Sequence, residues 1–198
     1  MPEDDPVTQQ NSTPARNSGV TDAALADRAA GGDRDAFGQL VTRYAPQARR
    51  VARAILGDPT DADDAAQDAF LSALVKLEQY DPTRPFGPWL MRIVANAATD
   101  RRRRRKVRQA EPLEPRHPSG GELPDAGAER RELGEALRAA LALLPERRRA
   151  AVVLYDVEGY SHAEIAKILG VPEGTARSDV FHARRALRAT LTAWKEQP

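Results

Sequence analysis

Residues 161–188 constrain the fold more than any other segment, because they read as two short helices joined by a tight turn. Gly170 can adopt the positive φ that ends the first helix, and Pro172 suits the first turn of the second. Both helices carry an apolar stripe at three- and four-residue steps: Ile165, Ile168, Leu169, Ala176, Val180, Ala183, Leu187 and Leu191. The small residues, the glycine turn and a basic second helix favour a helix-turn-helix over an ordinary helical hairpin.

The second of these helices has a polar face opposite its apolar stripe. That face is formed by Arg177, Ser178, Phe181, Arg184 and Arg188. Guanidinium groups pair with phosphates, and a basic helix of this kind fits the major groove of duplex DNA. The sequence therefore predicts a DNA-binding unit near its C-terminal end.

The chain divides into two helical regions separated by a segment rich in proline and glycine. Residues 1–20 are polar and are predicted to be a disordered tail, whereas 21–106 and 131–195 show helical periodicity. Residues 107–130 have almost nothing to bury and read as a flexible linker. The predicted fold is all-α, with two small helical domains of which the C-terminal one is a helix-turn-helix. Because neither domain offers the other much apolar surface, we expect them to be mutually unattached, with a third body setting their spacing.

The charges are segregated, although the net charge of the 198 residues is only +1. Residues 101–108 hold seven basic side chains in eight positions, whereas aspartates crowd residues 58–68. This separation indicates one surface for a polyanion and another for a basic or mixed partner.

Several function classes find no support in the sequence. The chain has no cysteine, which excludes disulfides and thiolate metal sites, and its three histidines are far apart. The segment Asp61-Ala-Asp-Asp lacks the glycine and the downstream glutamate of a calcium loop. We therefore expect no enzyme activity, cofactor or metal. With no run of about 18 apolar residues and no secretion signal, a cytosolic protein without membrane insertion is expected.

Residues 60–80 read as a helix with an unusual outward face. Thr60 is the predicted N-cap, and the predicted inward stripe is Ala65, Ala66, Ala69, Phe70, Ala73, Leu74 and Leu77. The opposite face carries Asp64, Gln67, Asp68, Leu71 and Val75. Apolar side chains rimmed by charge are typical of a docking surface, although scattered exposed apolar residues are also common.

A loop over residues 79–88 leads into a helix that begins near Trp89. We interpret the loop as carrying exposed aromatics, and Arg92, Asn96, Thr99 and Arg103 as the polar side of the helix. Guanidiniums that pair with phosphates, amides that read base edges and a pocket for an unstacked base all suit nucleic acid.

These motifs, in this order and spacing, resemble the extracytoplasmic-function (ECF) class of bacterial RNA polymerase sigma factors. The resemblance covers about residues 22–106 and 130–192. It is carried by the acidic helix from Asp61 to Phe70, the segment from Pro85 to Asn96, the arginine run, Leu144-Pro-Glu-Arg-Arg-Arg, Glu158-Gly-Tyr-Ser and the helix-turn-helix.

The resemblance implies a factor that binds core RNA polymerase, through its β and β′ subunits, and promoter DNA. Docking on the clamp helices of the largest subunit would use Asp64, Gln67, Asp68, Leu71 and Val75. The linker would thread toward the active-site cleft and the RNA exit path. By analogy with the class, we also expect an anti-sigma factor.

For the −10 element the resemblance implies a pocket for a flipped base. Its residues would be Tyr80, Phe86, Asn96 and Asp100, with Arg92 and Arg103 on the DNA backbone. The −35 element would be read by Thr175, Arg177, Ser178, Phe181 and His182, with Arg184 and Arg185 as candidates for phosphate or polymerase contacts.

The chain departs from the class at four positions. Asp179 stands where a basic residue is common, so it either repels phosphate or pairs with Arg184 or Arg185. His182 replaces a frequent arginine, and Leu74 a frequent tryptophan. Ala176 replaces a usual valine, which should loosen the helix crossing.

Two other interpretations stay open at this point. An autonomous helix-turn-helix transcriptional regulator would usually dimerise to read two half-sites, yet no dimerisation helix is evident and the first domain would be unexplained. A protein-interaction adaptor would make the basic runs incidental.

Overall fold

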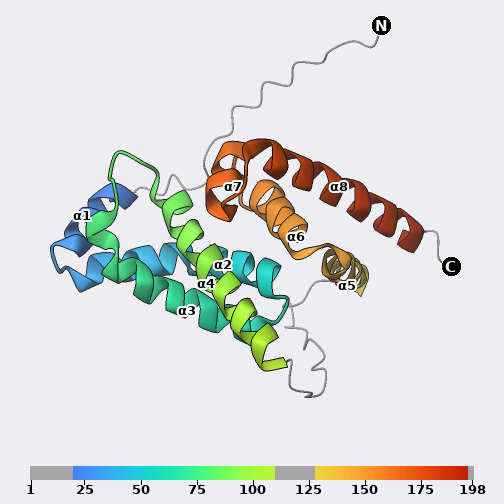
Figure 1. The fold of residues 1–198 in the computed structure, drawn as a ribbon, viewed down its shortest axis with the longest axis horizontal. Helices are drawn as coiled ribbons and strands as arrows, with labels where there is room; N and C mark the ends of the chain where they lie inside the picture. The colour runs from blue at the N-terminus through green and yellow to red at the C-terminus, as the bar shows by residue number, and fades with distance from the viewer. Residues whose placement is uncertain (1–19, 110–127, 196–198) are drawn as a thin grey trace, which may run out of the picture.

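The computed structural model describes residues 20–109 and 128–195, and every regular element in these two ranges is helical (Figure 1). The first range contains α1 (Asp22–Ala30), α2 (Arg34–Leu56), α3 (Pro59–Val75), the short 3₁₀ turn η1 (Leu77–Gln79) and α4 (Phe86–Gln109). The second contains α5 (Ala128–Leu143), α6 (Glu146–Val152), the π-helical turn η2 (Val153–Val157), α7 (His162–Leu169) and α8 (Glu173–Lys195). The all-α prediction is confirmed. The predicted tail and most of the predicted linker lie outside the described residues.

Local signals start the helices of the first domain. The Thr21 hydroxyl caps α1, and the Asp33 carboxylate accepts from two backbone N–H groups at the start of α2. For α3 the prediction of Thr60 as N-cap is wrong. Asp58 is the cap, accepting from the Asp61 N–H at 2.9 Å, because Pro59 fits the first helical position and moves the start two residues upstream.

Small side chains let α3 approach α2 and α4 closely. Its buried residues are all alanines: Ala62, Ala65, Ala66, Ala69 and Ala73. Leu74, predicted to point inward, is 46% exposed. Ala73, one residue earlier, is fully buried, so Leu74 lies at the edge of the inward stripe and faces partly outward.

The predicted helix-turn-helix is confirmed as α7 and α8. A capping box starts α7, in which the Ser161 hydroxyl accepts from the Glu164 N–H and the Glu164 carboxylate accepts from the Ser161 N–H. Gly170 ends the helix with φ of 67°. Pro172 lies just before α8, and its carbonyl accepts from the N–H groups of Thr175 and Ala176.

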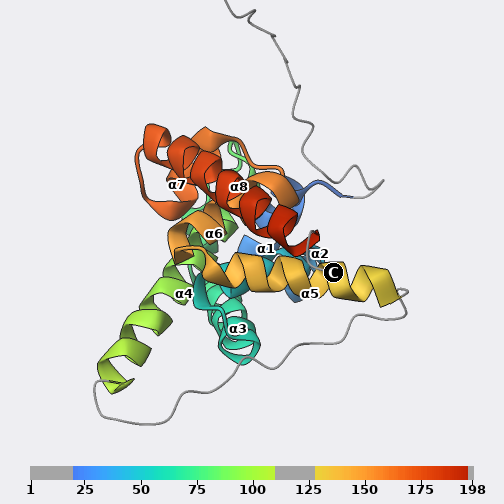
Figure 2. The ribbon, with the colours of Figure 1, turned by 90° about the vertical axis from the view of Figure 1, so that its right-hand side faces the viewer.

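The two domains are packed together, and the prediction that they are unattached is wrong for this structure. Figures 1 and 2 show α6 and α7 lying against α2 and α4. One apolar cluster crosses the boundary, joining Leu90 and Val94 of α4 to Ile165 and Ile168 of α7. Gly87 permits the close approach, since an added Cβ there would lie 2.9 Å from the Tyr160 hydroxyl.

A buried carboxylate forms the polar centre of this interdomain contact. Glu158 is 4% exposed and accepts from Arg50 Nε at 2.6 Å, Arg50 Nη2 at 3.1 Å and Gln47 Nε2 at 3.0 Å. The Tyr160 hydroxyl donates to Gln47 Oε1 at 3.3 Å. Nearby, Arg149 Nε donates to the Ala54 carbonyl at 2.5 Å, and burial lowers the pKa of Arg149. Among the described residues, no buried side-chain nitrogen or oxygen lacks a hydrogen-bond partner, which lowers the cost of burying these polar groups.

We predict that Glu158→Ala lowers the free energy of unfolding by about 1–3 kcal/mol, because Gln47 and Arg50 lose their buried acceptor. Arg50 is about half exposed, so water compensates part of the loss. Urea denaturation measures the difference. The control is Glu78→Ala, an exposed carboxylate without an ion pair among the described residues, which should change stability by less than about 0.5 kcal/mol. Equal losses for the two variants would contradict the prediction.

We also predict that the protein loses stability at alkaline pH. Burial raises the pKa of both Tyr44 and Tyr160, and a hydrogen bond from the Tyr44 hydroxyl to Asp22 raises that of Tyr44 further. A pKa raised by folding confers stability below the unfolded value, near 10, which is lost as pH rises toward the folded value. The free energy of unfolding should therefore fall above about pH 10. The double variant Tyr44→Phe/Tyr160→Phe should flatten that fall, and a slope equal to that of the parent chain would refute the explanation.

Candidate protein- and nucleic-acid-binding surfaces

The outward face of α3 is exposed, and it gathers the residues predicted for docking. Asp64, Gln67 and Asp68 are exposed, and Leu71 and Val75 are 58% and 80% exposed. Leu74 joins them at the end of the helix. We call these six residues the α3 face. It combines three neighbouring apolar side chains with an acidic rim, which suits a protein partner of mixed apolar and basic character.

Arg101 of α4 pairs with the acidic rim of this helix. Its Nε lies 3.1 Å from Asp61 Oδ1, another of its nitrogens bonds Asp64, and Nη1 lies 3.6 Å from Asp68 Oδ2. Partial burial alone would raise the pKa of Asp61, but hydrogen bonds from Arg101 and Arg105 lower it overall. The start of the arginine run thus offsets part of the negative charge of α3. Sequence reasoning missed this, because the run and the aspartates are about 40 residues apart.

The outer side of α4 presents four of the six residues predicted for the −10 element. Arg92, Asn96, Asp100 and Arg103 are exposed at three- and four-residue steps along the helix. Their amide, carboxylate and guanidinium groups can bond base edges and phosphates.

The other two predicted residues, Tyr80 and Phe86, are not at the surface. They are 8% and 2% exposed, so the interpretation of this loop as one of exposed aromatics is wrong. Their rings pack edge to face at 5.3 Å between centroids, and each also packs against Trp89. The Tyr80 hydroxyl donates to the Arg84 carbonyl at 2.5 Å, which leaves the phenol both buried and satisfied. The Tyr80 ring of the loop packs onto Phe86 and Trp89 in the first turn of α4, because the three rings gain more from mutual burial than from solvent.

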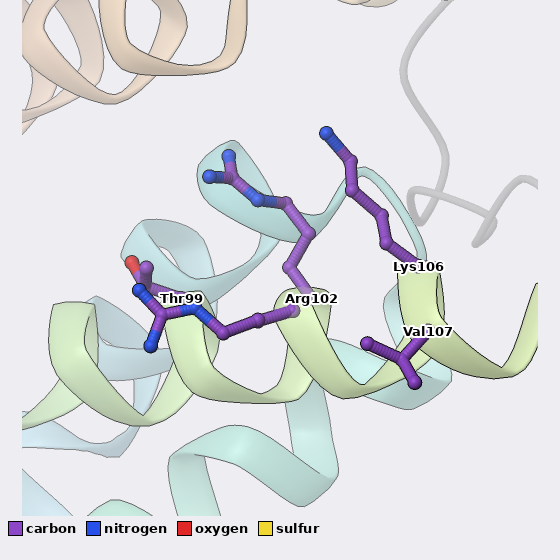
Figure 3. Close-up of a pocket in the computed structure, with 5 residues that line it drawn as sticks. Thr99, Arg102, Lys106 and Val107 are labelled. Carbon is purple, nitrogen blue, oxygen red and sulfur yellow. The ribbon is translucent and has the colours of Figure 1, made fainter.

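The later part of α4 borders an open hollow of about 540 Å³ (Figure 3). It is lined by Thr99, Arg102, Arg103, Lys106 and Val107. Arg102 also pairs with Glu146 of α6 and so adds a salt bridge between the domains. Arg103 and Lys106 make no ion pair with a described residue, so these two cations beside the hollow favour an anionic ligand such as a nucleic-acid backbone.

The polar face of α8 is open as predicted. Phe181 is 61% exposed, and it lies among exposed cationic and polar side chains: Arg177, Ser178, His182, Arg184 and Arg185. Thr175 is half-buried in the first turn. An exposed aromatic ring on a basic helix can contact the thymine methyl group while its neighbours hold phosphates and base edges.

Asp179 does not belong to this face, and both expectations for it are wrong. Its side chain is buried and bonds Arg147 Nε at 2.6 Å, with Arg148 Nε at 3.7 Å. Pairing with Asp179 raises the pKa of Arg147. The carboxylate points to α6 because it lies beside Ala176, Val180 and Ala183 on the inward stripe. It therefore neither opposes phosphate nor meets Arg184 or Arg185.

Comparisons with known proteins match both domains. The family model of Sigma-70 region 2 matches residues 40–108, and that of Sigma-70 region 4 matches residues 134–187. SigM of Mycobacterium tuberculosis, an ECF RNA polymerase sigma factor, is 42% identical over 171 residues, 86% of this chain and 85% of the relative. The sigma-E factor of Escherichia coli is 35% identical over 179 residues, 85% of this chain and 93% of the relative. The chain is an ECF sigma factor.

It follows that this sigma factor directs promoter recognition and transcription initiation by RNA polymerase, and that it belongs to a non-enzymatic family. The resemblance drawn from its motifs is confirmed. Among solved structures, CnrH in complex with the cytosolic domain of CnrY matches with a TM-score of 0.62 and 33% identity, over 87% of this chain and 97% of that one. The sigma factor RpoE of Bartonella quintana shares the fold, with a TM-score of 0.67 and 24% identity. Within residues 20–109 and 128–195, no helix is long and apolar enough to span a bilayer.

We predict that Arg101→Ala destabilises the sigma factor by about 1 kcal/mol at low ionic strength, because three aspartates of α3 lose their shared counterion. The loss should shrink at high ionic strength, where salt screens the repulsion. Urea denaturation at two salt concentrations measures both values. Arg104→Ala is the control, since Arg104 is exposed and makes no ion pair with a described residue. A loss independent of salt would rule out the electrostatic explanation.

Proposed function

We propose that the sigma factor divides promoter recognition among three surfaces: the α3 face docks on core RNA polymerase, the outer side of α4 binds the −10 element, and α8 reads the −35 element. The observation that supports this division is that each surface is separately exposed and carries a different chemistry. The α3 face is apolar and acidic, α4 is polar and cationic, and α8 is cationic around one exposed aromatic ring.

Docking on polymerase rests on the α3 face. Leu71, Leu74 and Val75 provide an apolar contact area, and the surrounding carboxylates favour a basic partner surface such as the clamp helices of β′. Arg101 holds Asp64 and Asp68 in place, so the acidic rim is ordered before the partner arrives.

On α4 the direct contacts to the −10 element are Arg92, Asn96, Asp100 and Arg103. Tyr80 in the loop and Phe86 at the start of α4 are buried, so they would have to be uncovered to form the walls of a base pocket. Melting needs no chemical step, because binding of extruded bases offsets the few kcal/mol of unstacking. The hollow beside Arg102 and Lys106 extends the cationic track along the DNA backbone.

On α8 the −35 element is read by Arg177, Ser178, Phe181 and His182 in the N-terminal half of the helix, with Thr175 at its start. Arg185 is exposed without an ion pair among the described residues and is available for a phosphate or for the β subunit.

Two further proposals follow from the relatives. CnrH is solved with the cytosolic domain of CnrY, and RpoE with the anti-sigma factor NepR. We propose that an anti-sigma partner likewise restrains this chain. We also propose that the sigma factor itself works in the cytoplasm, where core polymerase is found.

Run-off transcription with purified core polymerase tests the division of labour, on a promoter mapped by transcription start sites after overproduction. Leu71→Glu/Val75→Glu should weaken core binding by at least about tenfold and abolish stimulation. Phe181→Ala should keep core binding but lower use of the −35 element about tenfold. Val20→Glu, a charge placed on an exposed apolar residue outside the three surfaces, should change neither.

The alternatives predict different results. No stimulation by the folded parent protein would contradict the proposal. An autonomous regulator would instead give a footprint on a palindrome without polymerase, with the α3 variant unaffected.

A further inference from the structure

Arg184 lies on α8 beyond the recognition residues, but its guanidinium is turned back toward the π-helical turn η2. Its Nε bonds both carboxylate oxygens of Asp156, at 2.9 and 3.1 Å, and its Nη2 bonds Asp156 as well. Its central carbon lies 4.8 Å from the centroid of the Tyr155 ring, in a cation–π contact. The Tyr155 ring in turn stacks on His162, the first residue of α7, at 4.6 Å between centroids. We call Arg184, Asp156, Tyr155 and His162 the Arg184 clamp.

The π-helical turn makes this arrangement possible. A π turn accommodates one more residue than an α turn and so changes which side chains face outward, a device found often at functional sites. In η2 it leaves Leu154 fully buried in the core while Tyr155 and Asp156 reach α8. The clamp thus joins the end of α6, the start of α7 and the middle of α8.

The clamp gives α8 a directional contact, which its apolar packing does not provide. Among the residues that α8 buries, Ala176 and Ala183 are small, Val180 is the largest apolar one, and Asp179 is bonded to Arg147 of α6. Alanine methyl groups interlock weakly, so they allow α8 to rotate about its axis more easily than branched side chains would. The ion pair of Arg184 with Asp156, backed by the Tyr155 ring, adds a second polar anchor against that rotation beside Asp179, because it sets both the direction and the plane of the guanidinium.

We propose that Arg184 is a positioning residue for −35 recognition: held by Asp156 and Tyr155, it sets the rotation of α8 so that Arg177, Ser178 and Phe181 face the DNA bases, and it makes no phosphate contact of its own. This inference rests on the proposed reading of the −35 element by α8. It reassigns Arg184, while Arg185 keeps the role of phosphate or polymerase contact.

Neutralising Asp156 has opposite effects on promoter binding under the two possible roles of Arg184, positioning of α8 and phosphate contact. If Arg184 positions α8, neutralising Asp156 releases the clamp and damages recognition as much as neutralising Arg184 does. If Arg184 binds a phosphate, neutralising Asp156 frees a cation, removes a negative charge near the DNA and strengthens promoter binding.

The experiment uses holoenzyme and a set of promoters carrying each single-base change in the −35 element. For each variant, the ratio of transcription from the parent promoter to that from the altered promoters measures base discrimination. Asp156→Asn and Arg184→Gln should each lower that ratio about tenfold, the value of one good base contact. The double variant should do no further harm, because both changes break the same unit. Arg184→Lys should fail to restore discrimination, since an ammonium group cannot form the fork or the stacked contact.

Arg131→Gln is the matched control, an exposed arginine of α5 outside the three proposed surfaces and without an ion pair among the described residues. It should keep full base discrimination. Thermal unfolding of every variant and its affinity for core polymerase separate loss of positioning from loss of fold.

The proposal is overturned if Asp156→Asn strengthens or preserves promoter binding while Arg184→Gln weakens it equally on all promoter sequences. Arg184→Gln would then also lower the slope of log affinity against log salt concentration by about 1, as loss of one phosphate contact does. It is also overturned if the clamp variants keep full discrimination while Arg177→Gln loses it. If α8 does not read the −35 element at all, the result is different: Arg177→Gln and Phe181→Ala then leave base discrimination unchanged.

Discussion

The arrangement of the two domains depends on one buried carboxylate. Glu158 is almost fully removed from solvent, and an isolated charge in that position would be costly. Arg50 and Gln47 satisfy both of its oxygens from the opposite domain, so they replace the water that would hydrate the carboxylate if the domains separated. The apolar contact of α7 with α4 drives the association of the two domains. The carboxylate fixes how they are placed, because Arg50 and Gln47 of α2 can bond Glu158, directly after η2, in only one relative position.

This contact leaves the working surfaces open. It uses α2, α6, α7 and the side of α4 that faces them, whereas the α3 face, the outer side of α4 and the polar face of α8 remain exposed. The helix faces that would bind partners are therefore different from the faces that hold the two domains together. A protein that occupied all three exposed faces would not have to separate the domains to reach them.

Neighbouring arginines serve different purposes according to the helix face they occupy. Arg101 neutralises aspartates of α3, while Arg103, two residues later, is exposed for DNA. Arg147 holds the buried Asp179, and Arg149 reaches the backbone of α2. Arg184 is fixed by Asp156, while Arg185 is left outside. A basic run in the sequence thus overstates the cationic surface, because a helix distributes consecutive side chains around its circumference and carboxylates from other helices neutralise some of them.

By itself, the sequence determined the helices, the helix-turn-helix, the open faces of α3 and α8 and the family, because periodicity, caps and the glycine turn act over a few residues. Only the tertiary structure decided that Tyr80 and Phe86 are buried, that Asp179 points inward, and that the domains pack through Glu158. These outcomes depend on partners such as Arg147, 32 residues from Asp179, and Gln47, 111 residues from Glu158. A helical pattern tells which face is apolar, but what covers that face, and whether a charge on it finds a counterion, is settled only when distant segments meet.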